Sequence, residues 1–359
     1  MKKQTANQIT EGVIWKQLLL FFFPILFGTF FQQLYNTADA VIVGNFVGKE
    51  ALAAVGGPAA TLINLLVGFF VGLSSGATVI ISQFYGAKNN ADVKKAVHTS
   101  IALSLAGGAI IMILGLIFSG AALQLMNTPD DIMKLSLTYM RIYFLGVIPS
   151  LIYNMGSGIL RAAGDAKRPL YFLIISCFIN IILDIFFVVV LKLGVAGVAI
   201  ATTLSQVASA VMVLAALMRT TDSYKLYIRE IRFAPAILKH IIRIGLPAGL
   251  QSTMYSVSNL IIQASINAFG TDTIAAWTAY GKVDGIFWMI MGAYGVAITT
   301  FAGQNFGAGK YDRIHKASRS AWEWPPLPAY CSARLCFSAA GFSSACLPRM
   351  TVLSISACI

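Results

Sequence analysis

Charge is scarce in this sequence. Only 11% of its 359 residues are charged, whereas about a quarter are charged in a typical soluble globular chain. Hydrophobic residues make up 57% of the chain, and its mean hydropathy is +0.76. So little charge over so much apolar sequence excludes an ordinary soluble domain. It predicts an all-α polytopic membrane protein whose first partner is the lipid bilayer.

Motifs of catalysis and of metal binding are also missing. The sequence has no glycine-rich phosphate loop and no nucleophile elbow. Every cysteine except Cys177 lies after residue 330, and no pair has zinc-site spacing. We therefore expect no enzymatic activity, no cofactor and no metal beyond a Na⁺ that the protein could use as a coupling ion.

Apolar runs long enough to cross a bilayer are abundant by contrast. They lie near residues 16–45, 51–84, 96–119, 132–160, 169–191, 195–218, 240–269 and 273–306. Lys and Arg gather in every second connecting loop, as in 85–95 and 219–243, while the other loops carry a single lysine or acids. The positive-inside rule then places the N-terminus on the cytoplasmic side of the membrane. We expect that membrane to be a bacterial-type inner membrane. This topology explains the net charge of +12, so no nucleic-acid partner is needed.

The two halves of the chain repeat one another. Three landmarks recur at a slowly drifting offset, which is typical of an internal duplication. They are Pro24 with Pro247, Gly48 with Gly270, and Gln83 with Gln304, at offsets of 223, 222 and 221 residues. Six spans separate the copies, so both halves have the same orientation, as in the parallel repeats of many secondary transporters. We expect an N-terminal lobe of six helices at 1–218, a cytoplasmic linker at 219–239, and the first two helices of a C-terminal lobe at 240–319.

The repeat fails near residue 319. It predicts an apolar helix at about 319–340, but Pro325, Pro326 and Pro328 fall there, and they cannot share one helix interior. Cysteines become frequent in the same region. We therefore expect residues 320–359 to be a frame-shifted tail that replaces the rest of the second lobe.

Only three acids lie inside the apolar spans: Asp39, Asp184 and Asp284. Asn180 precedes Asp184 by four residues and shares its helix face, and Thr202 lies at a matching distance beyond the next loop. At ~1.5 Å per residue, Asp39, Asn180, Asp184 and Thr202 all fall roughly 10–14 Å below the outer surface. They form an oxygen-rich site for a proton or a hard monovalent cation, unless each is satisfied separately within the bundle. Asp284 has Lys282 two residues away, which does not face it, and the role of both stays open.

Small residues recur every four positions in the second span. Gly68, Gly72 and Gly76 form a stripe along one helix face. Such a stripe lets a neighbouring backbone approach closely, and we expect it to be a packing surface.

Four stretches carry a family resemblance. They are LYNTADAVIVGNFVG, GSGILRAAGDAKRP at 156–169, NIILD followed by GVAGVAIATTLSQ, and FAGQNFGAGK at 301–310. Together they resemble the MATE (multidrug and toxic compound extrusion) transporters, and in particular the DinF-type and Na⁺-driven bacterial pumps. The resemblance implies two six-helix lobes, alternating access, and antiport in which inward Na⁺ or H⁺ drives the export of organic cations by a monomer.

The resemblance also implies a cation site in the N-terminal lobe. The matching positions are Asp39, Asn180, Asp184 and Thr202, with Tyr139 as an additional contact. Some members carry an acid in the seventh helix, and the span at 240–269 has none, so a second site there is in doubt. Two alternatives stay open: a lipid-linked oligosaccharide flippase of the same superfamily, and a non-functional truncated remnant.

Overall fold

The computed structural model describes residues 9–267 and 271–323, and the regular structure in these ranges is helical. Its elements are α1 (Ile14–Phe46), α2 (Lys49–Gly56), α3 (Pro58–Gly86), α4 (Asn90–Leu125), α5 (Asp130–Leu145), α6 (Val147–Ala162), α7 (Lys167–Asp184), the π-helix η1 (Ile185–Val190), α8 (Gly194–Arg219), the short 3₁₀ helix η2 (Ile228–Glu230), α9 (Pro235–Asn267), α10 (Thr271–Gly307) and α11 (Tyr311–Glu323). Gly270 and residues 324–359 lie outside the described residues, so the predicted frame-shifted tail is left untested.

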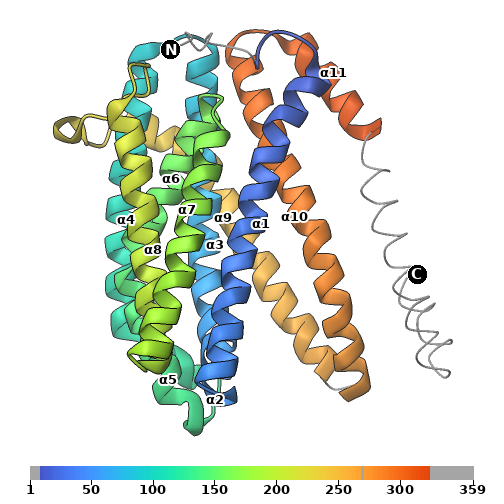
Figure 1. Ribbon diagram of the computed structural model, residues 1–359. Coiled ribbons are helices and arrows are strands. Elements are labelled where there is room, and N and C mark those ends of the chain that lie inside the picture. The colour runs from blue at the N-terminus through green and yellow to red at the C-terminus, as the bar shows by residue number, and fades with distance from the viewer. Residues whose placement is uncertain (1–8, 268–270, 324–359) are drawn as a thin grey trace.

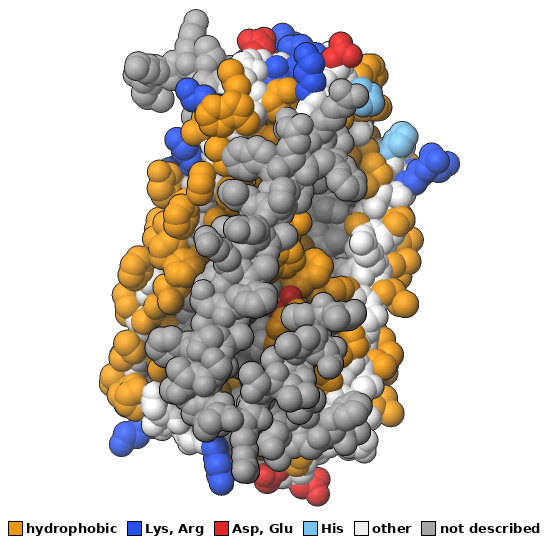
Figure 2. Space-filling model, turned by 90° about the vertical axis from the view of Figure 1, so that its right-hand side faces the viewer, with side chains coloured by type: hydrophobic (Ala, Val, Ile, Leu, Met, Phe, Trp, Pro, Cys, Tyr) orange, Lys and Arg blue, Asp and Glu red, His pale blue; other side chains and the backbone are white. Residues whose placement is uncertain are grey.

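The long helices run side by side as a membrane-spanning bundle (Figure 1). Within the described residues, six helical spans are long and apolar enough to cross a membrane, and the bent pair α5–α6 would make a seventh. Among the described residues, hydrophobic side chains gather along both sides of the molecule in Figure 2, and Lys and Arg lie toward its two ends. The prediction of an all-α polytopic membrane protein is confirmed. The expected span at 240–269 is present as α9, but polar residues such as Gln251 and Ser252 keep it out of that apolar set.

Two of the predicted spans, 51–84 and 132–160, are each broken into two helices. The run at 51–84 divides at Gly57, because Pro58 follows and disfavours helical geometry in the residue before it. The run at 132–160 divides at Gly146, where α5 and α6 meet at a bend of 50°. At that bend Thr203 of α8 fills the space that a side chain on Gly146 would need. Pro24, in contrast, lies inside an unbroken α1.

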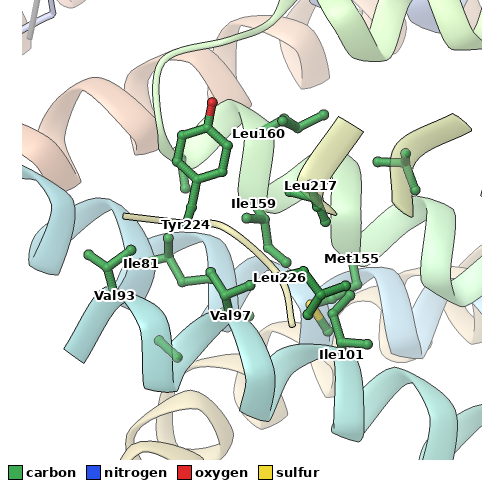
Figure 3. Close-up of a cluster of buried hydrophobic side chains, with 14 of the residues drawn as sticks. Ile81, Val93, Val97, Ile101, Met155, Ile159, Leu160, Leu217, Tyr224 and Leu226 are labelled. Atoms are coloured by element: carbon green, nitrogen blue, oxygen red, sulfur yellow. The ribbon is translucent and has the colours of Figure 1, made fainter. Parts of the chain in front are cut away.

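The N-terminal lobe is built from α1–α8, and one of its cores reaches the linker (Figure 3). Tyr224 and Leu226 follow α8 and pack against Ile81, Val97 and Ile159. The backbone N–H of Leu226 donates to the carbonyl of Leu217 at 3.0 Å. The first part of the linker therefore lies on the N-terminal lobe and is not a free tether.

A buried histidine anchors the next part of the linker. The backbone N–H of Tyr227 donates to Nε2 of His98 at 3.0 Å, and Lys94 Nζ lies 2.7 Å from Glu230 Oε2. Because Lys94 donates to it, the pKa of the Glu230 carboxyl is lowered. These contacts fix the position at which α9 begins.

The glycine stripe of α3 packs as predicted. A Cβ on Gly72 would lie 2.6 Å from Cα of Gly249 on α9, and one on Gly76 would lie 2.6 Å from the backbone nitrogen of Gly245. Only glycine permits this separation, since ordinary Cβ contacts begin near 3.4 Å. The two lobes are thus in direct backbone contact along α3 and α9.

Candidate functional site

Three helices of the N-terminal lobe bring the predicted cation-site residues together. Asp39 comes from α1, Asn180 and Asp184 from α7, and Thr202 from α8. All four are buried, and Asn180 and Asp184 are fully shielded, at 0% exposed. Thr202 Oγ1 lies 3.3 Å from Asp39 Oδ2, close enough to donate a hydrogen bond to it. Asp184 and Asn180 are further polar neighbours of the Asp39 side chain.

Most oxygens of this cluster have no hydrogen-bond partner among the described residues. They include Asp39 Oδ1 and both carboxylate oxygens of Asp184, and the side-chain amide of Asn180 is unpaired as well. A buried polar atom left without a partner costs about 1–3 kcal/mol, so several together in one place are unusual in a native structure. A bound proton, or a monovalent cation held by these oxygens, would satisfy them.

The local fold explains how α7 and α8 shape this site. α7 changes to the π-helix η1 immediately after Asp184, and such widened turns recur at functional sites. Val188 of η1 anchors the turn in the core. α8 approaches η1 closely, since a Cβ on Gly197 would lie 3.1 Å from Cβ of Phe187. The site is therefore held on packed helices and not on loops.

Tyrosines of the same lobe lie near the carboxylates. Tyr139 on α5 is 8% exposed and is an electrostatic neighbour of both Asp39 and Asp184, so the structure places it next to the predicted site. Its ring lies 6.2 Å from that of Tyr143. Gln206 Nε2 lies 3.5 Å from the Tyr143 hydroxyl.

Sequence reasoning missed Tyr143, Gln206 and also Tyr35, a further electrostatic neighbour of Asp39. The i, i+4 spacing of Tyr139 with Tyr143 on α5, and of Thr202 with Gln206 on α8, was the available signal.

Asp284 is not part of this cluster. It lies on α10, where the hydroxyl of Tyr280 donates to its Oδ1 at 3.4 Å. The side chain of Lys282 falls outside the described ones, so the predicted partners of this pair are left open.

A bundle of lipid-length helices around a buried, partly unpaired acidic cluster is the architecture of an integral membrane transporter. The sequence matches the MatE protein family over residues 24–186 and 247–324. The chain therefore belongs to the MATE family, and it is a transporter and not an enzyme.

Two bacterial relatives and one solved structure show the extent of the likeness. The probable multidrug resistance proteins YoeA and YpnP of Bacillus subtilis are each 30% identical to this chain. The aligned parts cover 85% and 86% of this chain, and 67% and 69% of those two proteins. A solved structure described as the outward-facing conformation of a multidrug resistance MATE family transporter superposes with a TM-score of 0.86 at 26% identity. That match covers 93% of this chain and 74% of the solved one, and it confirms the predicted fold class.

Proposed function

We propose that this chain is the core of a secondary active antiporter that exports organic cations in exchange for inward Na⁺ or H⁺. The observation that carries the proposal is the buried cluster of Asp39, Asp184 and Asn180, whose side-chain oxygens are largely unpaired. Relatives named as multidrug resistance proteins support an export role.

The cluster suggests how the two cargoes would be coupled. An uncompensated carboxylate at membrane depth is costly, so the Asp39–Asp184 pair is stabilised by binding a positive charge. When the site is empty, the same negative charge attracts a cationic substrate into the lobe. When Na⁺ or H⁺ binds, the charge is reduced and the substrate is released. Each cargo thus weakens the binding of the other, which is the linkage an exchanger needs.

Aromatic and apolar walls favour lipophilic cations as substrates. Tyr139 and Tyr143 are neighbours of Asp39, and aromatic rings attract cations that lie over their faces. The surrounding spans supply the apolar surface that a drug-sized molecule requires.

The proposed setting follows from the basic loops. We place the N-terminus in the cytoplasm and the protein in a bacterial-type inner membrane, where the site would face an inward cation gradient, and we treat the transporting unit as a monomer. Labelling of a cysteine added at the N-terminus, in intact cells and in everted vesicles, tests the orientation.

Efflux of an organic-cation dye in everted vesicles tests the function. Na⁺ concentration and pH are varied separately, so that the coupling ion is identified. Asp39→Asn and Asp184→Asn should each abolish cation-driven transport while the protein still inserts, and Asp130→Asn, on the exposed start of α5, serves as the matched control. Wild-type efflux rates in both site variants, or no gradient-dependent transport by the unaltered chain, would refute the proposal.

A further inference from the structure

A short segment before α1 crosses the junction of the two lobes. Residues 9–12, which we call the strap, lie at the end of the molecule where α1 begins and α10 and α11 meet (Figure 1). Ile9 is 7% exposed and Thr10 is 3% exposed. The side chain of Ile9 packs in one apolar cluster with Ala166 of the N-terminal lobe and Phe301 of α10. An N-terminal segment that had no role at the junction would not be expected to be buried between lobes.

The strap is held through its backbone carbonyls by the C-terminal lobe. Lys310 Nζ donates to the carbonyl of Thr10 at 2.9 Å, and Arg313 Nη1 donates to the carbonyl of Gly12 at 2.9 Å. Hydrogen bonds from charged donors are roughly twice as strong as neutral ones. The strap therefore connects α1 to the α10–α11 corner by two charge-assisted bonds.

Two adjacent buried amides complete the connection. Gln304 Nε2 donates to the carbonyl of Ala162, the last residue of α6, at 2.6 Å. Asn305 Nδ2 donates to the carbonyl of Phe301 at 2.8 Å and lies 3.5 Å from that of Ile9. Asn305 Oδ1 also accepts from Arg313 Nε at 3.1 Å. Gln304 and Asn305 belong to the FAGQNFGAGK stretch at 301–310, which contributes no residue to the cation site.

The helices under the strap are in backbone contact. A Cβ on Gly86 would overlap the carbonyl of Gln304, and one on Gly307 would overlap the carbonyl of Gln83. Under the repeat offset of 221 residues, Gly86 corresponds to Gly307 and Gln83 to Gln304. The two contacts are therefore equivalent to each other, and α3 and α10 cross symmetrically. Ser82 of α3 is 0% exposed and faces Gly303 across this crossing. The crossing therefore shields Ser82 from water, and separation of the lobes here would expose it.

We propose that the strap, with Gln304, Asn305, Lys310 and Arg313, is the latch of the cytoplasmic gate, which must release before the lobes separate at this end. This inference rests on the proposed transport function, because a gate matters only in a molecule that opens at alternate ends. The latch holds the crossing of α3 and α10 closed while the opposite ends of α9 and α10 splay from α1 (Figure 1).

Thiol labelling of a buried reporter tests the latch without any transport. The full chain carries Ser82→Cys in a background whose five native cysteines are replaced by alanine, and it is reconstituted in vesicles with no substrate and no cation gradient. K310M/R313Q removes both charged donors, and deletion of residues 2–12 removes their acceptors. Both changes should accelerate reaction of the reporter with a water-soluble maleimide by about ten-fold, the order expected for lost charged hydrogen bonds.

Three controls separate a latch from general loosening. K310R keeps a charged donor at position 310 and leaves both bonds of Arg313 in place, so it should stay as slow as the parent. Thr299→Val, on the same helix, removes a hydroxyl that bonds only within α10 and should change nothing. A second reporter, Ala199→Cys in the core of the N-terminal lobe, should react slowly in every variant. If Ala199→Cys reacts quickly in K310M/R313Q, that double substitution has loosened the whole fold. The latch is then judged from the deletion variant, which leaves α10 and α11 unaltered. Unchanged labelling of Ser82→Cys in the deletion variant, or labelling in K310R as fast as in K310M/R313Q, would overturn the proposal. Failure of dye transport would count against the proposed function, whereas the labelling rates test the latch contacts separately.

Discussion

Replacement of Gly72 by alanine should destabilise the protein, because the added methyl group forces α3 and α9 apart. The added Cβ would lie 2.6 Å from both Cα and the nitrogen of Gly249 and 2.7 Å from the carbonyl of Ala248. To reach an ordinary contact of 3.4 Å, the helices must separate locally by roughly 0.8 Å. Every contacting atom is backbone, so no side chain can rotate away. Overpacking of this kind costs about 1–3 kcal/mol.

The matched control is Gly292→Ala on α10, where an added Cβ meets no atom within 4 Å. Removing a helical glycine at an open site should stabilise the protein by about 0.5–1 kcal/mol. The free energy of unfolding is measured for both variants by titrating detergent-solubilised protein with a denaturing detergent. The two changes should move it in opposite directions. Equal effects, or a stabilised Gly72→Ala variant, would refute the view that the lobes meet through backbone contact on this stripe.

Three further outcomes are expected. Thr202→Val removes a hydroxyl oxygen beside Asp39 and should raise the Na⁺ concentration for half-maximal efflux by about five-fold if Na⁺ is the coupling ion. If H⁺ is the coupling ion, the same change should lower the H⁺ concentration required, because the lost hydrogen bond stabilised the ionised carboxylate. Thr202→Ser should keep the wild-type value, and equal behaviour of the two variants would contradict a role for the hydroxyl. The Lys94 ammonium lowers the pKa of the Glu230 carboxyl. The pair therefore stabilises the fold at pH values above the ordinary pKa of a glutamate, and this stabilisation is lost as the pH falls through the lowered pKa. Glu230→Gln should therefore melt below wild type at neutral pH, with a gap that closes on acidification; a gap independent of pH would contradict it. Dye competition should favour lipophilic cations over anionic or neutral dyes of similar size, and export of all three classes at similar rates would count against a carboxylate-lined site.

Much of the fold could be predicted from the sequence because lipid imposes a simple rule. In lipid, backbone polar groups must be paired within each span, so a long apolar run is expected to form a helix. The breaks at Gly57 and Gly146 did not follow from that rule. Both depend on local backbone geometry and on the neighbouring chain, as the packing of Thr203 against Gly146 shows, while hydropathy stays high across them.

The candidate site was predictable for a related reason. Charged residues inside spans are rare, so Asp39 and Asp184 stand out, and helix rise gives their depth. Tyr143 and Gln206 were missed because tyrosine and glutamine are common on helix faces. Their presence in a span therefore does not indicate a functional site as strongly as a buried aspartate does. The strap was out of reach altogether, since it is bound through backbone carbonyls, which every residue possesses. The available sequence signal was in the side chains that donate hydrogen bonds to the strap, Lys310 and Arg313. Their positive charge was interpreted only as evidence of membrane topology.

Infrared difference spectroscopy of the reconstituted chain tests the central claim most directly, because it observes the carboxyl groups themselves. Spectra are compared as Na⁺ is added at constant pH and as pH is varied without Na⁺, for wild type and for the Asp39→Asn/Asp184→Asn double variant. If the buried pair is the coupling site, a carboxyl band of the wild type will respond to at least one of the two cations, and the double variant will lack that response. A wild-type spectrum indifferent to both cations, or the same response in the double variant, would contradict the account.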